Sequence, residues 1–494
     1  MVARAVRVSA GDNVATLLQD CAAGEPVEAG DASVVAREAV PRGHKIALGR
    51  IEAGQEVVKF GFPIGRAQRA IGEGEHVHSA NLGTALAGTL DYAFRPSAPL
   101  APPSTGATTF RGYVRPDGRV GTRNEIWVLP TVGCVARTAQ RIAAAAAASH
   151  AGRIDGVHAF THPHGCSQLG DDLGGTRAIL TALADHPNAG GVLIVGLGCE
   201  ENQLSGILAA LPEARRPFVR TLVTQLAGDE QAEGERLVAE LVGIASQARR
   251  EEVGLDRLVL GVKCGGSDGL SGLTANPLVG RMSDRVAGAG GSVLLTEIPE
   301  VFGAEQILMN RAADEQVFAR VVGLVNGFKR YFLDHGQPVS ENPSPGNVAG
   351  GITTLEEKSL GAVQKGGQAT VTDVIGYGGQ VSRPGLTLLE APGNDAVSST
   401  ALAAAGATAI LFTTGRGTPL GFPVPTVKIA SNSDLAARKP GWIDFDAGRA
   451  LEDGLDATAE ALLARIAAIA SGEETAAERN DEREIAIWKR GVTL

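Results

Sequence analysis

Short, continuous apolar runs alternate with helical stretches through most of this chain, and this alternation constrains its fold more than any other feature. Residues 126–132, 191–195 and 257–262 have the length and composition of strands, and stretches with helical periodicity lie between them. Strands that are apolar on both sides are typical of parallel sheets whose two faces are covered by helices. We therefore expect a large α/β part with mainly parallel sheets, arranged as two Rossmann-like lobes.

The chain of 494 residues is long enough for several domains. Up to about residue 95 the apolar runs are short and are broken by Gly and Pro, which predicts a small β-rich domain over residues 1–95. Residues 96–107 are rich in proline and predict a semi-extended linker. A second Gly- and Pro-rich stretch at 341–351 is either an active-site loop or a boundary, and a boundary there divides the α/β part into lobes at 108–345 and 346–494.

Composition excludes several classes of protein. The net charge is −10 without a strongly basic patch, which argues against nucleic-acid binding but leaves a small anionic substrate open. No apolar run of about 18 residues is present, so we expect no membrane span. The five cysteines occur in a chain without an apparent export signal, so we expect reduced thiols and a cytoplasmic protein.

Four of the five cysteines, Cys134, Cys166, Cys199 and Cys264, each come just after a predicted strand. In open parallel sheets, ligands bind outside the carboxyl ends of the strands. We therefore favour metal ligation or a shared catalytic crevice for this set, whereas a single cysteine in such a turn would more often be a small buried side chain.

Histidines occur in two further groups. His162 and His164 flank Pro163 just before Cys166, and His76 and His78 alternate in the N-terminal segment, so that both face one side of a strand. Imidazoles suit iron, manganese or zinc. A histidine in such a position is about as often a loop or solvent-exposed residue that binds no metal. His44 and Lys45 place a titratable base beside a cation, for which an exposed polar turn is the equal alternative.

Two glycine-containing turns, 263–268 and 415–419, place Lys263 or Arg416 beside backbone N–H groups that can bind an anion. Ordinary tight turns explain them about equally well. Neither has the spacing of a P-loop, and no glycine-rich fingerprint supports a nicotinamide cofactor.

Longer motifs resemble one known family, the altronate and galactarate dehydratases, with the sulfolactate sulfo-lyases as more distant members. The matching segments extend over nearly the whole chain and occur in one order: 41–48, 112–115, 120–124, 196–200, 264–268, 274–277, 342–347 and 412–419. The resemblance implies that residues 1–95 form a SAF (β-clip) domain. It also implies an Fe²⁺-dependent hydro-lyase, with Mn²⁺ as a second possible metal. Residues 75–81 look like the altronate branch of the family, so we expect D-altronate rather than galactarate as substrate.

The expected product is 2-keto-3-deoxy-gluconate, and galactarate dehydration or a sulfolactate-type cleavage are the alternatives. A sugar-acid-binding sensor is the non-enzymatic alternative, and an iron–sulfur cluster on the strand-end cysteines is the alternative cofactor. A homodimer is the default assembly.

Dehydration needs a base, an acid and cationic groups near the substrate carboxylate. We expect His44 or Lys45 to transfer protons, with Glu297 as a weaker candidate. The candidate metal ligands are the following cysteines and histidines: His76, His78, Cys134, His164, Cys166, Cys199 and Cys264. The candidates for substrate binding are Arg123, Asn124, Lys263, Ser267, Asp268, Arg416 and Thr418.

Overall fold

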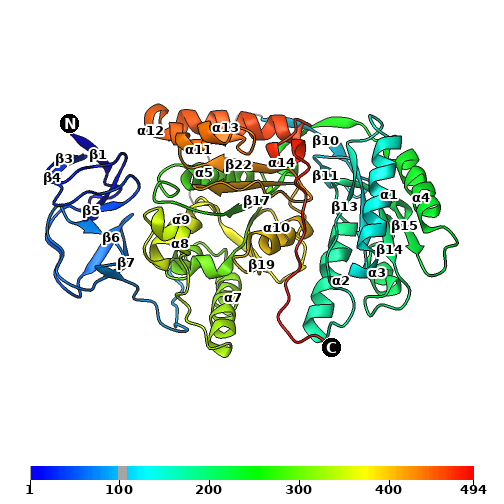
Figure 1. Ribbon diagram of the computed structural model, residues 1–494, viewed down its shortest axis with the longest axis horizontal. Coiled ribbons are helices and arrows are strands. Elements are labelled where there is room, and N and C mark those ends of the chain that lie inside the picture. Colours follow the sequence, from blue (N-terminus) through cyan, green and yellow to red (C-terminus); the bar gives the residue numbers. More distant parts are fainter. Residues whose placement is uncertain (1, 98–107) are drawn as a thin grey trace.

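The computed structural model describes residues 2–97 and 108–494, which form an N-terminal β domain, a C-terminal domain and a middle domain (Figure 1). In the view of Figure 1, the C-terminal domain lies between the other two. Most of the expected linker, residues 98–107, lies outside the described residues.

The N-terminal β domain consists of two small sheets of short strands joined by turns. The six-stranded sheet has the order β4-β3-β1-β2-β5-β8, formed by β1 (Ala3–Val6), β2 (Val14–Leu17), β3 (Pro26–Ala29), β4 (Ala32–Val35), β5 (Lys45–Ala47) and β8 (His76–Val77). The three-stranded sheet contains β6 (Glu56–Lys59), β7 (Phe62–Ala67) and β9 (Leu82–Gly83). In β3 the apolar residues Val27 and Ala29 are buried while their neighbours are exposed, the alternation that a half-buried strand requires.

The middle domain is built on a four-stranded parallel sheet of order β13-β12-β14-β15. Its strands are β12 (Glu125–Pro130), β13 (Gly156–Ala159), β14 (Ala189–Gly196) and β15 (Val219–Val223). The helices are η1 (Gly133–Val135), α1 (Ala136–Ser149), α2 (Gly170–Ala184), α3 (Leu204–Ala210), η2 (Glu213–Phe218) and α4 (Glu230–Ala245). Every residue of β12 and β14 is buried, as expected for strands covered on both faces.

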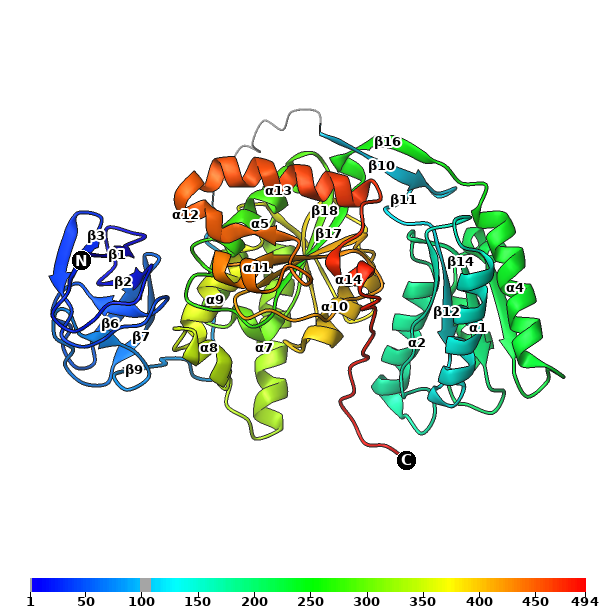
Figure 2. The same ribbon diagram turned by 45° about the horizontal axis from the view of Figure 1, so that its top comes forward.

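A small antiparallel sheet lies next to the middle domain and adjoins α13 of the C-terminal domain (Figure 2). It consists of β10 (Thr109–Val114), β11 (Val120–Gly121) and β16 (Arg250–Gly254), in the order β11-β10-β16. Five residue pairs join β10 to β16, from Thr109–Gly254 to Tyr113–Arg250. The start and the end of the middle domain are therefore held together in one ladder.

The C-terminal domain contains a seven-stranded parallel sheet of order β19-β20-β18-β17-β21-β22-β23. Its strands are β17 (Val259–Cys264), β18 (Ser292–Leu295), β19 (Val371–Ile375), β20 (Gly385–Leu389), β21 (Ala409–Thr414), β22 (Thr426–Ala430) and β23 (Phe445–Asp446). The longer helices are α5 (Ala275–Gly288), α7 (Glu315–Asp334), α9 (Leu355–Gln364), α10 (Asp395–Ala404) and α13 (Leu455–Ala470). The shorter ones are η3 (Leu255–Arg257), η4 (Ile298–Val301), α6 (Glu305–Met309), α8 (Pro345–Ala349), α11 (Ser433–Arg438), η5 (Ala447–Arg449), α12 (Ala450–Asp453) and α14 (Ala476–Arg479).

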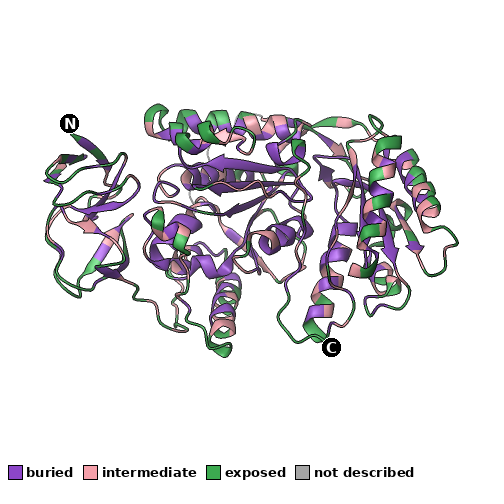
Figure 3. Cartoon of the chain, viewed as in Figure 1, coloured by how far each residue is buried: buried purple, intermediate pink, exposed green. Residues whose placement is uncertain are grey.

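Buried residues fill the sheet and the inner faces of these helices (Figure 3). The expected fold class, a small β-rich domain with a large α/β part of mainly parallel sheets, is confirmed.

The lobe boundary differs from the one expected at residues 345/346, because one sheet includes strands from residue 259 to residue 446. The Gly- and Pro-rich stretch at 341–351 is a loop with the short helix α8, since turn residues mark surface loops as well as domain boundaries.

All five cysteines are free thiols. Among the described residues, no helix has both the length and the apolar character needed to cross a bilayer.

Candidate active site

The N-terminal β domain contacts the C-terminal domain through the turn that precedes β5. A Cβ atom on Gly269 would lie 1.9 Å from the carbonyl oxygen of Gly43, and one on Gly351 would lie 2.4 Å from the same atom. Only glycine allows the backbones to approach this closely. The turn that carries His44 and Lys45 is therefore held directly against the loops that follow β17 and α8.

Three imidazoles meet on this side of the β domain. His44 Nδ1 lies 3.0 Å from His76 Nε2, and the ring centroids of His44, His76 and His78 are 5.0 to 5.1 Å apart. β5 and β8 bring them together, because Ile46 pairs with His76 in the antiparallel ladder. The expectation that His76 and His78 share one side is confirmed.

The imidazole cluster faces backbone carbonyls of α8 in the C-terminal domain. His44 Nε2 lies 3.3 Å from the oxygen of Ala349, and His78 Nε2 lies 3.0 Å from that of Val348. Burial lowers the pKa of His44. Burial, together with the neighbouring His44, lowers the pKa of His76 to about 4. Both rings are neutral at pH 7, so their nitrogen lone pairs are available to a metal or a proton.

Lys45 is fully buried and points into the domain interface. Its ammonium donates to the carbonyl oxygen of Gly351 at 2.7 Å and to Glu357 Oε2 at 2.9 Å. Lys59 of β6 donates to the other oxygen of Glu357 at 2.9 Å. One carboxylate of α9 thus binds two lysines of the β domain. Burial lowers the pKa of Lys45 to about 8, opposed by the attraction of Glu357.

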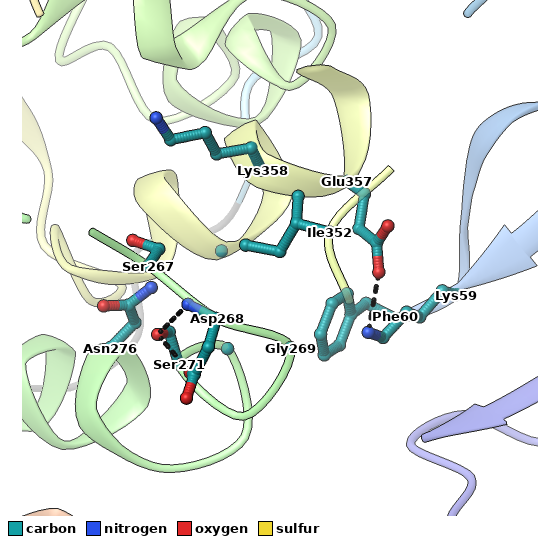
Figure 4. A pocket seen from close by; sticks show the side chains of 12 residues that line it. Lys59, Phe60, Ser267, Asp268, Gly269, Ser271, Asn276, Ile352, Glu357 and Lys358 are labelled. Atoms are coloured by element: carbon teal, nitrogen blue, oxygen red, sulfur yellow. Dashed lines mark hydrogen bonds and ion pairs between the residues drawn. The ribbon is translucent and has the colours of Figure 1, made fainter. Parts of the chain in front are cut away.

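Figure 4 shows the small cavity beside this ion pair, with Lys59 reaching Glu357 on one side and Ser267, Asp268 and Asn276 on the other. Its volume is about 20 Å³, enough for about one water molecule. The two domains are therefore closed against each other here.

A second set of buried charges follows β17 and β18. Lys263 Nζ lies 3.0 Å from Glu297 Oε1 and 2.7 Å from Asp395 Oδ1, and Lys365 Nζ lies 3.4 Å from Glu297 Oε2. Burial lowers the pKa of Lys263, but the attraction of Glu297 and Asp395 outweighs burial and raises it. Conversely, burial raises the pKa of Glu297, and the attraction of Lys263 and Lys365 outweighs burial and lowers it.

Glu297 has a left-handed backbone, with φ of +64°, which is rare for a residue with a side chain. Its side chain accepts a hydrogen bond from the backbone N–H of Cys264 at 2.9 Å. The strained turn places the carboxylate at the carboxyl end of β17, as strain at functional positions often does. Glu297 lies just past β18, as expected from the sequence.

Cys264, Glu297 and Glu300 are the one group of potential metal ligands among the described residues whose donor atoms lie within 4.8 Å of one another. Glu300 Oε1 also binds Lys358 at 2.8 Å. Burial raises the pKa of the Cys264 thiol to about 12. Glu300, Glu357 and Lys358 were missed from the sequence, because only burial distinguishes them from surface charges. A weak signal was present, since Glu297 and Glu300 both follow a buried strand.

The other residues of the 263–268 turn mostly hold the loops together. Asp268 accepts hydrogen bonds from Ser271 and Ser431 at 2.8 Å and from Asn432 at 3.0 Å. The buried Ser267 offers its carbonyl oxygen to Asn347. These contacts position the two loops, and both residues also line the small cavity at the domain interface. Their contact with substrate stays a prediction.

Arg416 and Thr418 lie on the neighbouring turn after β21, where the backbone N–H of Gly415 donates to the carbonyl oxygen of Gly266. Thr418 Oγ1 accepts a hydrogen bond from the N–H of Leu420. Arg416 is exposed, and no hydrogen bond or ion pair is seen for its guanidinium within the described parts of the chain. Arg416 is therefore a cation with free donors at the edge of the sheet.

Arg123 and Asn124 differ from their expected role in substrate binding. Arg123 is buried, and its guanidinium forms a two-point ion pair with Glu478 at 2.7 and 2.9 Å. Asn124 binds Arg115 and the carbonyl oxygen of Ala245. Their polar groups are engaged inside the protein, so both residues join elements of the fold.

Three of the four strand-end cysteines lie away from this interface. Cys134, Cys166 and Cys199 are exposed at the carboxyl edge of the four-stranded sheet, where His164 is half-buried, whereas Cys264 is buried at the end of β17. The two sheets occupy separate domains (Figure 1). The structure thus divides the expected cysteine set into a group of three and a single residue.

Comparison with known proteins assigns the family. Three family models match in chain order: the altronate/galactarate dehydratase SAF domain over residues 3–85, the D-galactarate dehydratase/altronate hydrolase second domain over residues 112–248, and the D-galactarate/altronate dehydratase C-terminal domain over residues 255–493. The boundary between the last two agrees with the observed sheets.

The chain is also similar to altronate dehydratases along its whole length. It is 48% identical to the altronate dehydratase of Bacillus subtilis (strain 168), over 99% of both chains, and 48% identical to that of Escherichia coli (strain K12), again over 99% of both. Identity to the E. coli galactarate dehydratase (L-threo-forming) is 32%, over 83% of this chain and 82% of the relative. The resemblance drawn from the sequence motifs is confirmed: the chain belongs to the altronate and galactarate dehydratase family and is a dehydratase of the hydro-lyase class.

Proposed function

We propose that the protein dehydrates D-altronate to 2-keto-3-deoxy-gluconate and water, at the interface between the N-terminal β domain and the carboxyl edge of the seven-stranded sheet. The observation that carries this proposal is the contact of the imidazole cluster and Lys45 with residues 348–357 of the C-terminal domain. The choice of D-altronate rests on the higher identity to altronate dehydratases, 48% against 32% for galactarate dehydratase.

The reaction removes the hydrogen next to the carboxylate and expels the neighbouring hydroxyl. The carbanion that forms has a doubly charged carboxylate, so cationic groups near it lower the barrier most. Lys263, Lys358 and Lys365 are buried within one cluster of charges, and fixed charges in a water-poor site act more strongly than in solvent. We assign them the stabilisation of this charge.

Proton transfer needs a base near the α-carbon and an acid near the departing hydroxyl. His44 is neutral at pH 7 because burial lowers its pKa. Its Nε2 faces the Ala349 carbonyl and its Nδ1 faces His76, so Nδ1 is the atom that can accept the proton once substrate replaces His76 as its partner.

Glu297, the weaker candidate, is ionised because Lys263 and Lys365 lower its pKa, so it can accept a proton but cannot donate one. The imidazolium that His44 becomes in the first step can then protonate the departing hydroxyl. Lys45 is engaged with Glu357 and the Gly351 carbonyl, and its role is to hold the β domain in place rather than to transfer protons.

The resemblance implies Fe²⁺, and the protein offers two donor sets for it, the imidazole cluster and the Cys264 group. His76 and His78 offer imidazoles next to neutral His44, and imidazole suits Fe²⁺. In the Cys264 group both carboxylates are bound to lysines, which repel a divalent cation. We therefore assign the metal to His76 and His78. When bound, the metal supplies a Lewis acid for the substrate carboxylate.

Substrate binding requires the two domains to separate. The cavity at the interface has a volume of about 20 Å³, far too small for a six-carbon acid. A larger cavity of about 890 Å³ has an aromatic side with Phe328, Tyr331 and Trp488 and a second side formed by the loop that includes Asn342 and Ala349. The aromatic side does not match a polyhydroxylated acid, whereas the loop side adjoins the imidazole cluster through the carbonyl oxygen of Ala349. Arg416, with its free donors, is the candidate that binds the substrate carboxylate as the domains reopen.

The test is an anaerobic assay with Fe²⁺ and a panel of D-altronate, galactarate and (2R)-sulfolactate. The expected result is 2-keto-3-deoxy-gluconate from D-altronate at a kcat/KM at least about tenfold above galactarate. Faster turnover of galactarate would replace the substrate assignment. Binding without any keto acid product would favour a sensor.

The metal assignment has its own test. Iron content after anaerobic loading should fall in the double variant His76→Ala/His78→Ala and stay at the wild-type level in Cys264→Ser. The reverse pattern would place the metal at the Cys264 group.

Two further proposals concern the protein as a whole. The first is a cytoplasmic location, because all five cysteines are free and a reducing compartment keeps thiols in that state. We expect a homodimer, and light scattering of the purified chain would show a different mass if this is wrong.

A further inference from the structure

Three exposed thiols at one edge of the middle domain take no part in the proposed reaction. Cys134 follows β12, Cys166 follows β13 and Cys199 follows β14, and these strands are neighbours in the order β13-β12-β14. All three thiols are free and exposed. Cysteine is among the most frequently buried residue types, so packing does not account for three exposed cysteines on adjacent loops.

Backbone hydrogen bonds join the three loops into one platform. The N–H of Gly133 donates to the carbonyl oxygen of His164 at 2.8 Å, and the N–H of Asn202 donates to that of Gly165 at 3.1 Å. The side chain of Asn202 donates to the carbonyl oxygen of Thr131 at 3.0 Å. Each loop therefore contacts another, and the thiols are held at the same edge of the sheet.

A glycine precedes each of the three cysteines, and two of these glycines are required by the backbone. Gly165 has a φ of +103° and Gly198 a φ of +129°, a region that side chains disfavour. A Cβ on Gly165 would also lie 2.1 Å from the carbonyl oxygen of Thr131. The turns before Cys166 and Cys199 thus have backbone conformations that favour glycine, and the first turn packs closely against Thr131. The thiols themselves remain exposed.

The separation of the three thiols argues against a single metal ion shared by all of them. A single zinc or iron ion binds sulfur at about 2.3 Å, which places its ligands within about 4 Å of one another. Within the described residues, the one group of three ligands whose donor atoms come within 4.8 Å of one another is that of Cys264, and none of these three thiols belongs to it. A cluster of several metal ions spans a wider gap and binds soft thiolates.

The geometry points to an iron–sulfur cluster held by Cys134, Cys166 and Cys199, with one iron of a four-iron cluster left without a cysteine ligand. The carboxylate of Glu201 is the neighbouring group, since it accepts a hydrogen bond from the N–H of Ser167 at 3.0 Å and from the Cys166 thiol. This cluster is independent of the metal assigned to the imidazoles, because it belongs to another domain.

The test is anaerobic reconstitution of the full chain with Fe²⁺, sulfide and a thiol reductant. The wild-type protein should become brown and retain about four iron and about four acid-labile sulfide per chain beyond the iron at the imidazoles. The triple variant Cys134→Ser/Cys166→Ser/Cys199→Ser should retain no sulfide. Cys21→Ser, which changes a thiol of the N-terminal β domain, is the matched control and should keep the wild-type sulfide content.

Alkylation of the exposed thiols with iodoacetamide gives a second route that does not depend on folding of a variant. Protein alkylated before reconstitution should fail to gain sulfide, whereas protein reconstituted first should be protected at the three cysteines. Wild-type protein that gains no labile sulfide would overturn the proposal. One zinc or one iron bound to these thiols without sulfide would also overturn it, in favour of a single-ion site.

Discussion

Lys45 Nζ lies 2.9 Å from Glu357 Oε2, and this buried ion pair joins the N-terminal β domain to the C-terminal domain. Glu357 also binds Lys59, so two ammonium groups share one carboxylate and the group of three keeps one net positive charge. The pKa values of Lys45 and Glu357 are both lowered, but for different reasons. Burial dominates for Lys45 and lowers its pKa, whereas for Glu357 burial is outweighed by the attraction of the two lysines, which also lowers its pKa.

Glu357→Gln should destabilise the protein strongly. The change leaves Lys45 and Lys59 buried without a counter-charge, and breaking a buried ion pair in this way costs about 3–5 kcal/mol. Urea unfolding should show this loss, together with faster hydrogen exchange around β5. Glu56→Gln is the matched control, because its partner Arg66 is exposed. Equal stability of the two variants would mean that the interface does not depend on Glu357.

The contribution of Glu357 should disappear in acid. Its folded-state pKa is lowered, so the stabilisation is fully present above the ordinary value of 4.5 and is lost as the pH falls below it. The difference in unfolding free energy between the wild type and Glu357→Gln should therefore be constant between about pH 5 and 7 and shrink between about pH 4.5 and 3. A difference that stays constant down to pH 3 would contradict the assignment.

His44→Ala should reduce kcat at least about a hundredfold, because the variant lacks the proposed proton acceptor. His335→Ala is the control, since this histidine is exposed at the end of α7. Near-wild-type turnover in His44→Ala would remove this imidazole from the chemistry.

The positions of the candidate residues along the chain were more predictable than their contacts. Continuous apolar runs predict β12 and β17, so the cysteines at their ends could be placed at sheet edges. The assignment of Cys264 to a different sheet from Cys134 depends on strand order, which no local pattern encodes. Likewise, the sequence does not show that the guanidinium of Arg123 is engaged with Glu478, because the partner lies 355 residues further along the chain.

Thiol labelling should separate the cysteines by burial. Cys134, Cys166 and Cys199 are exposed, whereas Cys264 is buried and burial raises its pKa to about 12, so little of it is the reactive thiolate. Mass spectrometry after brief iodoacetamide treatment of the metal-free native protein should find the first three labelled and Cys264 unmodified. Rapid labelling of Cys264 would show that the buried end of β17 becomes accessible in solution.

Arg416→Ala should raise the KM for the sugar acid about tenfold or more with a smaller effect on kcat. The guanidinium binds a carboxylate that is charged in both the ground state and the transition state. Loss of the guanidinium therefore weakens the binding of both states to a similar degree. Arg438→Ala is the control, because Arg438 is also exposed but lies on α11. An unchanged KM would exclude Arg416 from binding. A fall in kcat at constant KM would instead place its contact in the transition state, where the negative charge on the carboxylate is greatest.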